Sequence, residues 1–116
     1  MNANEFEELL RNHLLISGKL VTDAKAGDTN AAAEDRRNWY ANADEIADFL
    51  ARINPYWSKQ EWQSLLYDHL KMTEDEATYR LSGQYAQDIM IYALIEDEAL
   101  KMADYMSQGI IKQFRI

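Results

Sequence analysis

The sequence resembles itself when it is shifted by 56 residues. His13 then falls on His69 and Gly27 on Gly83, and the match runs on without a gap. The other identical pairs are Glu5 with Glu61, Leu9 and Leu10 with Leu65 and Leu66, Leu14 with Leu70, Thr22 with Thr78, Ala43 with Ala99, and Ala47-Asp48 with Ala103-Asp104. Because a fixed internal offset indicates repeated structural units, we predict two copies of one supersecondary unit.

Each copy has the pattern of two helices joined at a glycine. From Phe6 onward, apolar residues recur every three or four positions, which is the spacing of one helix face. Gly27 and Gly83 are expected to end the first helix of each copy, since glycine readily adopts the left-handed conformation that closes a helix. The second helices are predicted to run roughly over Thr29–Ile53 and Tyr85–Phe114.

A short linker separates the two copies. Asn54-Pro55-Tyr56-Trp57 interrupts the helical pattern, because proline lacks the backbone N–H and disfavours a helical conformation in the preceding residue. Ser58 and Glu61 have the spacing of a capping box, and Asp28 or Thr29 can cap the helix after Gly27. The predicted organisation is one helical-bundle domain over residues 1–116, with hairpins at 2–53 and 58–114 and a linker at 54–57.

The predicted fold class is all-α. Four helices of this length with short connections are typical of an antiparallel four-helix bundle, here made of two duplicated αα-hairpins. A chain of 116 residues suits a single domain. The expected core is Phe6, Leu9, Leu10, Ile16, Leu20, Trp39, Ala43, Ile46, Leu50, Ile53, Trp62, Leu65, Leu66, Met72, Ile91, Ile95, Met102 and Met106.

The composition argues against several kinds of partner. A net charge of −8 disfavours nucleic acid, which needs a basic surface to displace counterions from its phosphates. The chain has no cysteine, so disulfides, thiolate metal ligands and thiol nucleophiles are excluded. No stretch of eighteen apolar residues is present, so no membrane span is expected. We therefore expect a cytoplasmic protein.

The two histidines are the main candidates for chemistry. His13 and His69 lie among apolar residues on their helices, so both are expected to face the core. Histidines and carboxylates inside helical bundles build metal sites. With a rise of about 1.5 Å per residue, Asp44 and Glu98 are the partly inward acids nearest to the histidine layer. These four residues form a candidate site for iron, manganese or zinc.

A structural role for the histidines is the competing interpretation, and we favour it. Di-iron bundles place a glutamate three residues before each histidine, whereas Leu10 and Leu66 occupy those positions. Ser17 and Thr73, one turn further on, are expected to bond either the imidazole or a carbonyl of the preceding turn. We therefore expect no cofactor, with a transition-metal ion as the alternative.

Two further features are candidates for polar or ligand-binding sites. Asp88 is expected level with Glu76 and near Arg36 or Arg37, which predicts a partly buried ionic cluster at the loop end. A small-molecule pocket between the helices is a third hypothesis, and its ligand is unknown. Its expected lining is Trp39, Tyr40, Trp62 and Tyr92.

Four segments carry a resemblance to a known family. They are residues 9–14 (LLRNHL), 39–47 (WYANADEIA), 54–57 (NPYW) and 109–114 (GIIKQF). With these segments the chain resembles an uncharacterised family of bacterial helical proteins, found especially in spore-forming bacilli. Some members carry the names acetylglutamate kinase or glycosyltransferase, but this sequence has no glycine-rich loop to hold nucleotide phosphates.

The resemblance also bears on assembly. The relatives are longer, with a further helical segment upstream, so we expect this chain to leave apolar surface that a homodimer would bury. The leading hypothesis is a non-enzymatic four-helix bundle that acts through protein association, without nucleic-acid or membrane partners. The alternative is a metal-binding helical bundle with a redox or storage role.

Overall fold

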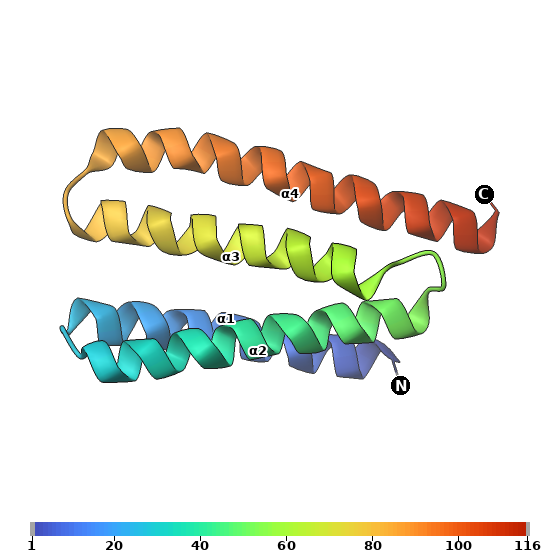
Figure 1. Ribbon diagram of the computed structural model, residues 1–116, viewed down its shortest axis with the longest axis horizontal. Coiled ribbons are helices and arrows are strands. Elements are labelled where there is room, and N and C mark those ends of the chain that lie inside the picture. The colour runs from blue at the N-terminus through green and yellow to red at the C-terminus, as the bar shows by residue number, and fades with distance from the viewer. Residues whose placement is uncertain (1, 116) are drawn as a thin grey trace. The chain divides into compact units, whose positions relative to one another are not determined.

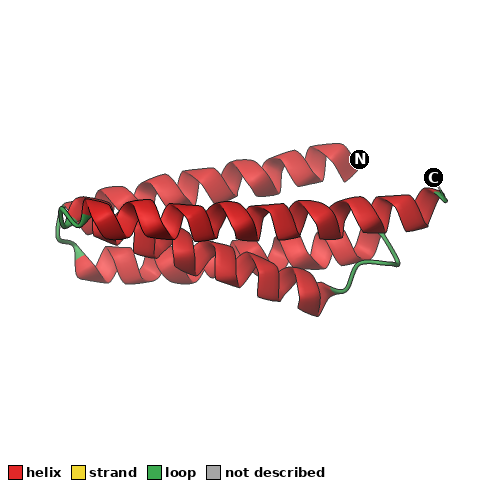
Figure 2. Cartoon of the chain, turned by 90° about the horizontal axis from the view of Figure 1, so that it is seen from above, coloured by secondary structure: helices red, strands yellow, loops and turns green. Residues whose placement is uncertain are grey.

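The computed structural model describes residues 2–115, and every regular element in that range is a helix (Figures 1 and 2). The prediction of an all-α chain with four helices is confirmed. The helices are α1 (Asn2–Lys25), α2 (Thr29–Ile53), α3 (Lys59–Leu81) and α4 (Tyr85–Phe114). The chain divides into two compact units, the first ending at Phe49 and the second beginning at Leu50.

The first unit is a pair of helices that pack along their length. Near one end the rings of Phe6 and Phe49 stack at 5.6 Å. Near the other end, Lys19 Nζ lies 2.9 Å from Asp35 Oδ1. Because residue numbers rise along α1 as they fall along α2, this unit is a helical hairpin.

The second unit has the same construction. The rings of Trp62 on α3 and Tyr105 on α4 meet edge to face at 5.3 Å. Arg80 Nη1 lies 3.3 Å from Asp88 Oδ2 near the turn that joins the two helices. These contacts again pair an early residue of one helix with a late residue of the other, so α3 and α4 form a second hairpin.

Both hairpins turn at the predicted glycines. Gly27 has φ of 78° and Gly83 has φ of 77°, the left-handed region that side chains with a Cβ rarely adopt. In each turn the residue after the glycine donates its N–H to a carbonyl five residues back, Asp28 to Asp23 at 3.0 Å and Gln84 to Tyr79 at 2.8 Å. This is the Schellman pattern, which satisfies carbonyls that the helix end leaves open.

Two of the predicted helix caps are also present. Ser58 Oγ accepts the backbone N–H of Glu61 at 3.2 Å, at the start of α3. Asp28 Oδ1 accepts the backbone N–H of Ala31 at 3.1 Å, at the start of α2. Each cap satisfies a donor that has no partner within its own helix.

The linker between the hairpins is a tight turn organised by Asn54. The side chain of Asn54 is 1% exposed as a residue, and its Oδ1 accepts the N–H of Tyr56 at 2.8 Å. Its backbone carbonyl accepts the N–H of Trp57 at 3.2 Å. The Asn-Pro segment therefore folds as an Asx-type turn, which asparagine favours because its side chain can bond the backbone two residues on.

The end of the linker is fastened to α4. Trp57 Nε1 donates to the carbonyl of Tyr105 at 3.3 Å, and the N–H of Ser58 donates to the Tyr105 hydroxyl at 2.8 Å. The indole of Trp57 lies against Gly109, where an added Cβ would overlap the ring. Gly109 therefore provides the space that lets Trp57 pack on the helix.

The buried apolar residues agree with most, not all, of the predicted core. Leu10 was expected in the core but is 41% exposed, so that prediction is wrong. Its position on α1 lies beside the buried strip rather than on it. Phe49, Trp57 and Leu70 are buried although they were not predicted. The buried apolar set is Leu9, Leu20, Ala32, Trp39, Ala43, Ile46, Ala47, Phe49, Leu50, Trp57, Trp62 and Leu70.

Candidate functional site

In the first unit, His13 contacts a buried amide. Its Nδ1 donates to Asn42 Oδ1 at 2.8 Å, and Asn42 Nδ2 donates to the carbonyl of Leu9 at 3.1 Å. Asn42 is only 5% exposed, so the two bonds fix its orientation. The imidazole also lies beside Trp39, with ring centres 5.5 Å apart. The bond at Nδ1 sets the tautomer of His13, because an amide oxygen can only accept.

In the second unit, His69 contacts a buried carboxyl at the corresponding place. His69 Nδ1 lies 3.1 Å from Glu98 Oε2, and in each pair the two residues are 29 positions apart. Glu98 is 6% exposed, and its Oε1 has no hydrogen-bond partner among the described residues. Burial raises the pKa of Glu98 to about 7, with a further contribution from the nearby Asp68. Burial also lowers the pKa of His69.

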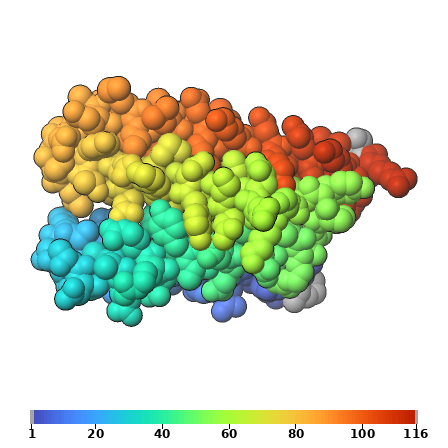
Figure 3. All heavy atoms as spheres, viewed as in Figure 1, coloured from blue at the N-terminus to red at the C-terminus, as the bar shows by residue number. Residues whose placement is uncertain are grey.

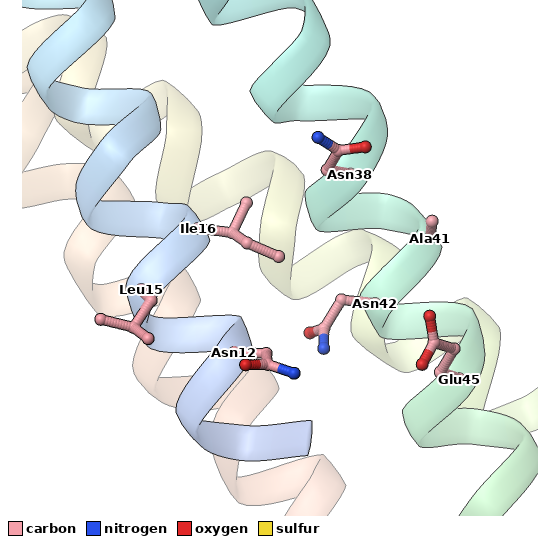
Figure 4. A pocket seen from close by; sticks show the side chains of 7 residues that line it. All are labelled: Asn12, Leu15, Ile16, Asn38, Ala41, Asn42 and Glu45. Carbon is pink, nitrogen blue, oxygen red and sulfur yellow. The ribbon is translucent and has the colours of Figure 1, made fainter. Parts of the chain in front are cut away.

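A groove lies beside the histidine pair in each unit. The groove of the first unit has a volume of about 310 Å³ and that of the second about 320 Å³. In Figure 4, Asn12 and Ile16 of α1 and Asn42 of α2 reach into the space between the two helices. The first groove is lined by Asn12, Leu15, Ile16, Asn38, Ala41, Asn42 and Glu45. The second is lined by Asp68, Lys71, Met72, Leu94, Asp97, Glu98 and Lys101.

The two linings occupy the same seven positions, 56 residues apart, but differ in chemistry. The first groove presents three asparagine amides and a single charged side chain, Glu45. The second presents three carboxyl groups and two lysines, of which Lys71 also bonds Asp75 at 3.0 Å. One shape therefore carries a nearly neutral lining in the first unit and a strongly charged one in the second.

The four residues predicted as metal ligands lie in two places. His69 and Glu98 come together in the second unit. In the first unit, His13 contacts Asn42, and Asp44 lies half-buried two residues further along α2. Within residues 2–115, no group of three or more His, Asp or Glu side chains is arranged to hold a metal ion.

Asn42 is the residue that sequence reasoning missed. Counting levels along the helices indicated Asp44, because only acids were considered as partners of the histidines. The internal offset contained the signal, since it places Asn42 opposite Glu98. An amide on the buried face of α2 was therefore identifiable as the counterpart of the acid on α4.

The hydroxyls beyond each histidine bond the backbone. Ser17 Oγ donates to the carbonyl of Leu14 at 2.8 Å, and Thr73 Oγ1 donates to that of His69 at 2.7 Å. Of the two partners expected for these hydroxyls, the structure contains the helix carbonyl. The acceptors described for the histidines are instead the side chains of Asn42 and Glu98.

Charged contacts near the two turns differ between the units. In the second unit, Asp88 pairs with Arg80, and burial together with a hydrogen bond to Asp88 raises the pKa of Glu76. The predicted association of Glu76 with Asp88 is therefore confirmed, and Arg80 is a partner that the sequence did not indicate. In the first unit, Lys19 lies 2.8 Å from Asp23 and 2.9 Å from Asp35, which is 3% exposed. These hydrogen bonds raise the pKa of Lys19.

One face of α4 is apolar and exposed along the whole helix. In Figure 3 the orange-to-red atoms of α4 form an outer edge of the second unit. At 3.6 residues per turn, seven large apolar residues of α4 fall within an arc of about 100°. We call them the α4 stripe, and they are between 38% and 71% exposed: Tyr85, Ile89, Tyr92, Leu100, Ile110, Ile111 and Phe114.

The α4 stripe has no apolar counterpart on α2. The α2 positions 56 residues earlier hold Thr29, Ala33, Arg36 and Asp44, where α4 holds Tyr85, Ile89, Tyr92 and Leu100. The contrast indicates that the stripe is not a requirement of the hairpin itself.

No family model, curated protein or solved structure matches this chain. Over residues 2–115, none of the helices has both the length and the apolar character needed to cross a membrane.

Proposed function

We propose that the chain is an antiparallel four-helix bundle that arose by duplication of one αα-hairpin. Pairs of contacts related by the 56-residue offset support this proposal. The ring contact of Phe6 with Phe49 corresponds to that of Trp62 with Tyr105. The histidine contacts, the glycine turns and the two groove linings recur at the same offset.

We further propose that this protein acts through protein association, without an enzymatic activity, and that it forms a homodimer. The observation that carries the proposal is the exposed α4 stripe. Single exposed apolar residues are ordinary on protein surfaces, but a contiguous apolar face marks an interaction surface. Its replacement by polar residues on α2 supports a role specific to α4.

The proposal also includes a cytoplasmic location and membership of the bacilli-type helical family. The cysteine-free composition is compatible with a reducing compartment. The four segments given above support the family assignment.

Sedimentation of the full chain tests the association. The wild-type protein is expected to sediment at twice the mass of the 13.5 kDa chain at micromolar concentration. Ile89→Glu, in the middle of the exposed face, is expected to shift the protein to a single chain, because a carboxylate in an apolar interface loses its hydration.

Leu15→Glu is the matched control. Leu15 is 65% exposed on α1, close to the 71% of Ile89, but lies outside the α4 stripe. This variant is expected to remain dimeric. A wild-type protein that sediments as a single chain would overturn the proposal, and so would a dimer that Ile89→Glu leaves intact.

A metal-binding role is the second candidate function, and the His69–Glu98 pair favours it. Glu98 Oε1 is buried without a partner, and a cation would satisfy it. The proposed ligands for iron, manganese or zinc are His69 and Glu98, with His13 and Asp44 of the first unit as the remaining candidates. Such a protein would serve redox or storage chemistry.

Elemental analysis of untagged protein separates the two functions. Stoichiometric metal that is lost in His69→Ala and in Glu98→Gln would support the metal-binding role. Metal-free protein in which both variants keep their oligomeric state would support association alone. Circular dichroism of each variant checks that the helices are retained.

A further inference from the structure

We infer that the homodimer forms by antiparallel packing of α4 against α4 of a second copy, around a two-fold axis between Ala99 and Leu100. This inference rests on the proposed function, because it assigns the partner and the register of the α4 stripe. It is carried by the positions of the stripe residues along the helix.

The stripe is nearly symmetric about this point. Tyr85 lies as far before it as Phe114 lies after it, and Ile89 lies as far before it as Ile110 lies after it. In a two-fold antiparallel pair, residues at equal distances on either side of the axis meet. Tyr85 would therefore face Phe114 of the second copy, and Ile89 would face Ile110.

The same register places large residues against small ones. Tyr92 would face Ser107 of the second copy, and Leu100 would face Ala99. Small residues on the same face of the middle of α4 let the helices approach, while the large apolar residues at the ends fill the contact. Packing between helices depends on this interlocking of projecting side chains with gaps.

Glu96 distinguishes antiparallel from parallel packing. It is an exposed acid in the arc of the stripe. Parallel packing in register would place Glu96 against its own copy, where two like charges repel. In the antiparallel register Glu96 faces Ala103, and the two copies of Glu96 are offset by about 10 Å along the axis. The charge pattern therefore favours the antiparallel arrangement.

The area of the stripe is sufficient for a stable dimer. A large apolar or aromatic side chain has a surface on the order of 200 Å². Seven such residues at 38% to 71% exposure present on the order of 800 Å² per chain, which is the usual contribution of each partner to a stable interface.

Cysteine cross-linking tests the register, and the absence of native cysteine makes each introduced thiol unique. Leu100→Cys is expected to link two chains under mild oxidation, because the two copies of this position meet near the axis. Ile89→Cys alone and Ile110→Cys alone are expected to remain single chains on a denaturing gel. A mixture of these two variants is expected to form the mixed disulfide, which mass spectrometry identifies.

Leu15→Cys on α1 controls for random collision between exposed thiols. Linking of Ile89→Cys to itself as readily as Leu100→Cys would overturn the antiparallel register while leaving the proposed association intact. A sedimenting dimer in which none of the α4 cysteines link would overturn the stripe as the interface. A wild-type protein that is a single chain would remove both the inference and the proposed function.

Discussion

Asn42 and Glu98 make the same contact in two different chemical forms. Each lies 29 residues after a histidine and places a side-chain oxygen at the histidine Nδ1, at 2.8 Å for Asn42 and 3.1 Å for Glu98. The amide of Asn42 keeps one charge state at all pH values. Glu98 instead gains or loses its proton near neutral pH, since burial raises its pKa to about 7. The two units are therefore expected to respond differently to pH.

Glu98→Gln is expected to remove a pH-dependent loss of stability. In the unfolded chain the pKa of Glu98 is 4.5, and in the folded chain it is about 7, so the folded state binds the proton more tightly. The stabilisation is complete below pH 4.5 and is lost as the pH rises through 7. By linkage the loss amounts to at most about 3 kcal/mol. Urea unfolding at pH 5 and pH 8 measures it.

The glutamine variant should change less in stability between these two pH values than the wild-type protein does. The lowered pKa of His69 acts in the opposite direction, because the unfolded chain takes up a proton first as the pH falls below 6.5. Asp104→Asn, at an exposed position on α4, serves as the control and should follow the wild-type curve. Parallel curves for wild type and Glu98→Gln would contradict the prediction.

Asn42→Ala is expected to lower the free energy of unfolding by about 1–3 kcal/mol, because it removes two bonds and leaves buried partners at His13 and Leu9. Asn12→Ala, in the same groove but exposed, should change it by less than about 0.5 kcal/mol. Chemical denaturation compares the two variants. Equal costs would show that the buried amide is not a stabilising contact.

Substitution of alanine at two helical glycines is expected to have opposite signs. At Gly18 an added Cβ has nothing within 4 Å, so Gly18→Ala should stabilise the protein by about 0.5–1 kcal/mol through helix propensity. At Gly109 the Cβ would overlap the buried indole of Trp57, so Gly109→Ala should destabilise it by about 1–3 kcal/mol. Thermal unfolding of both variants measures the difference. A stabilising Gly109→Ala would contradict the packing of Trp57 on α4.

Tyr105→Phe is expected to cost about 0.5–1.5 kcal/mol, because it removes the acceptor of the Ser58 N–H but keeps the ring beside Trp62. The phenylalanine would reproduce Phe49, the residue 56 positions earlier. Tyr56→Phe, in the linker and 51% exposed, is the control and should be close to neutral. The prediction fails if the two variants unfold at the same denaturant concentration.

Much of the fold follows from local rules that the sequence displays directly. The glycine turns, the Ser58 cap and the bounds of α2 and α4 were predicted because each depends on residues close together in the chain. Leu10 was assigned to the core wrongly, since helical spacing alone defines a strip to within about one residue on either side. The buried state of Leu70 depends on how neighbouring elements pack, which spacing does not determine.

The site was predictable only in part for a related reason. Counting residues from the glycines gave the correct level for Glu98, and its contact with His69 is present. The same count did not single out Asn42, because a level along the axis does not specify the rotation of a residue about it. The α4 stripe was also missed, because a helix with apolar residues on two faces shows no single dominant period.

The positions of the tryptophans give each unit its own optical reporter. Trp39 is the indole of the first unit, whereas Trp57 and Trp62 belong to the second. Emission from a Trp39→Phe variant would therefore follow the melting of the second hairpin, and emission from a Trp57→Phe, Trp62→Phe variant would follow the first. Coincident or separate transitions would then show whether the two halves of this chain are one cooperative body or two.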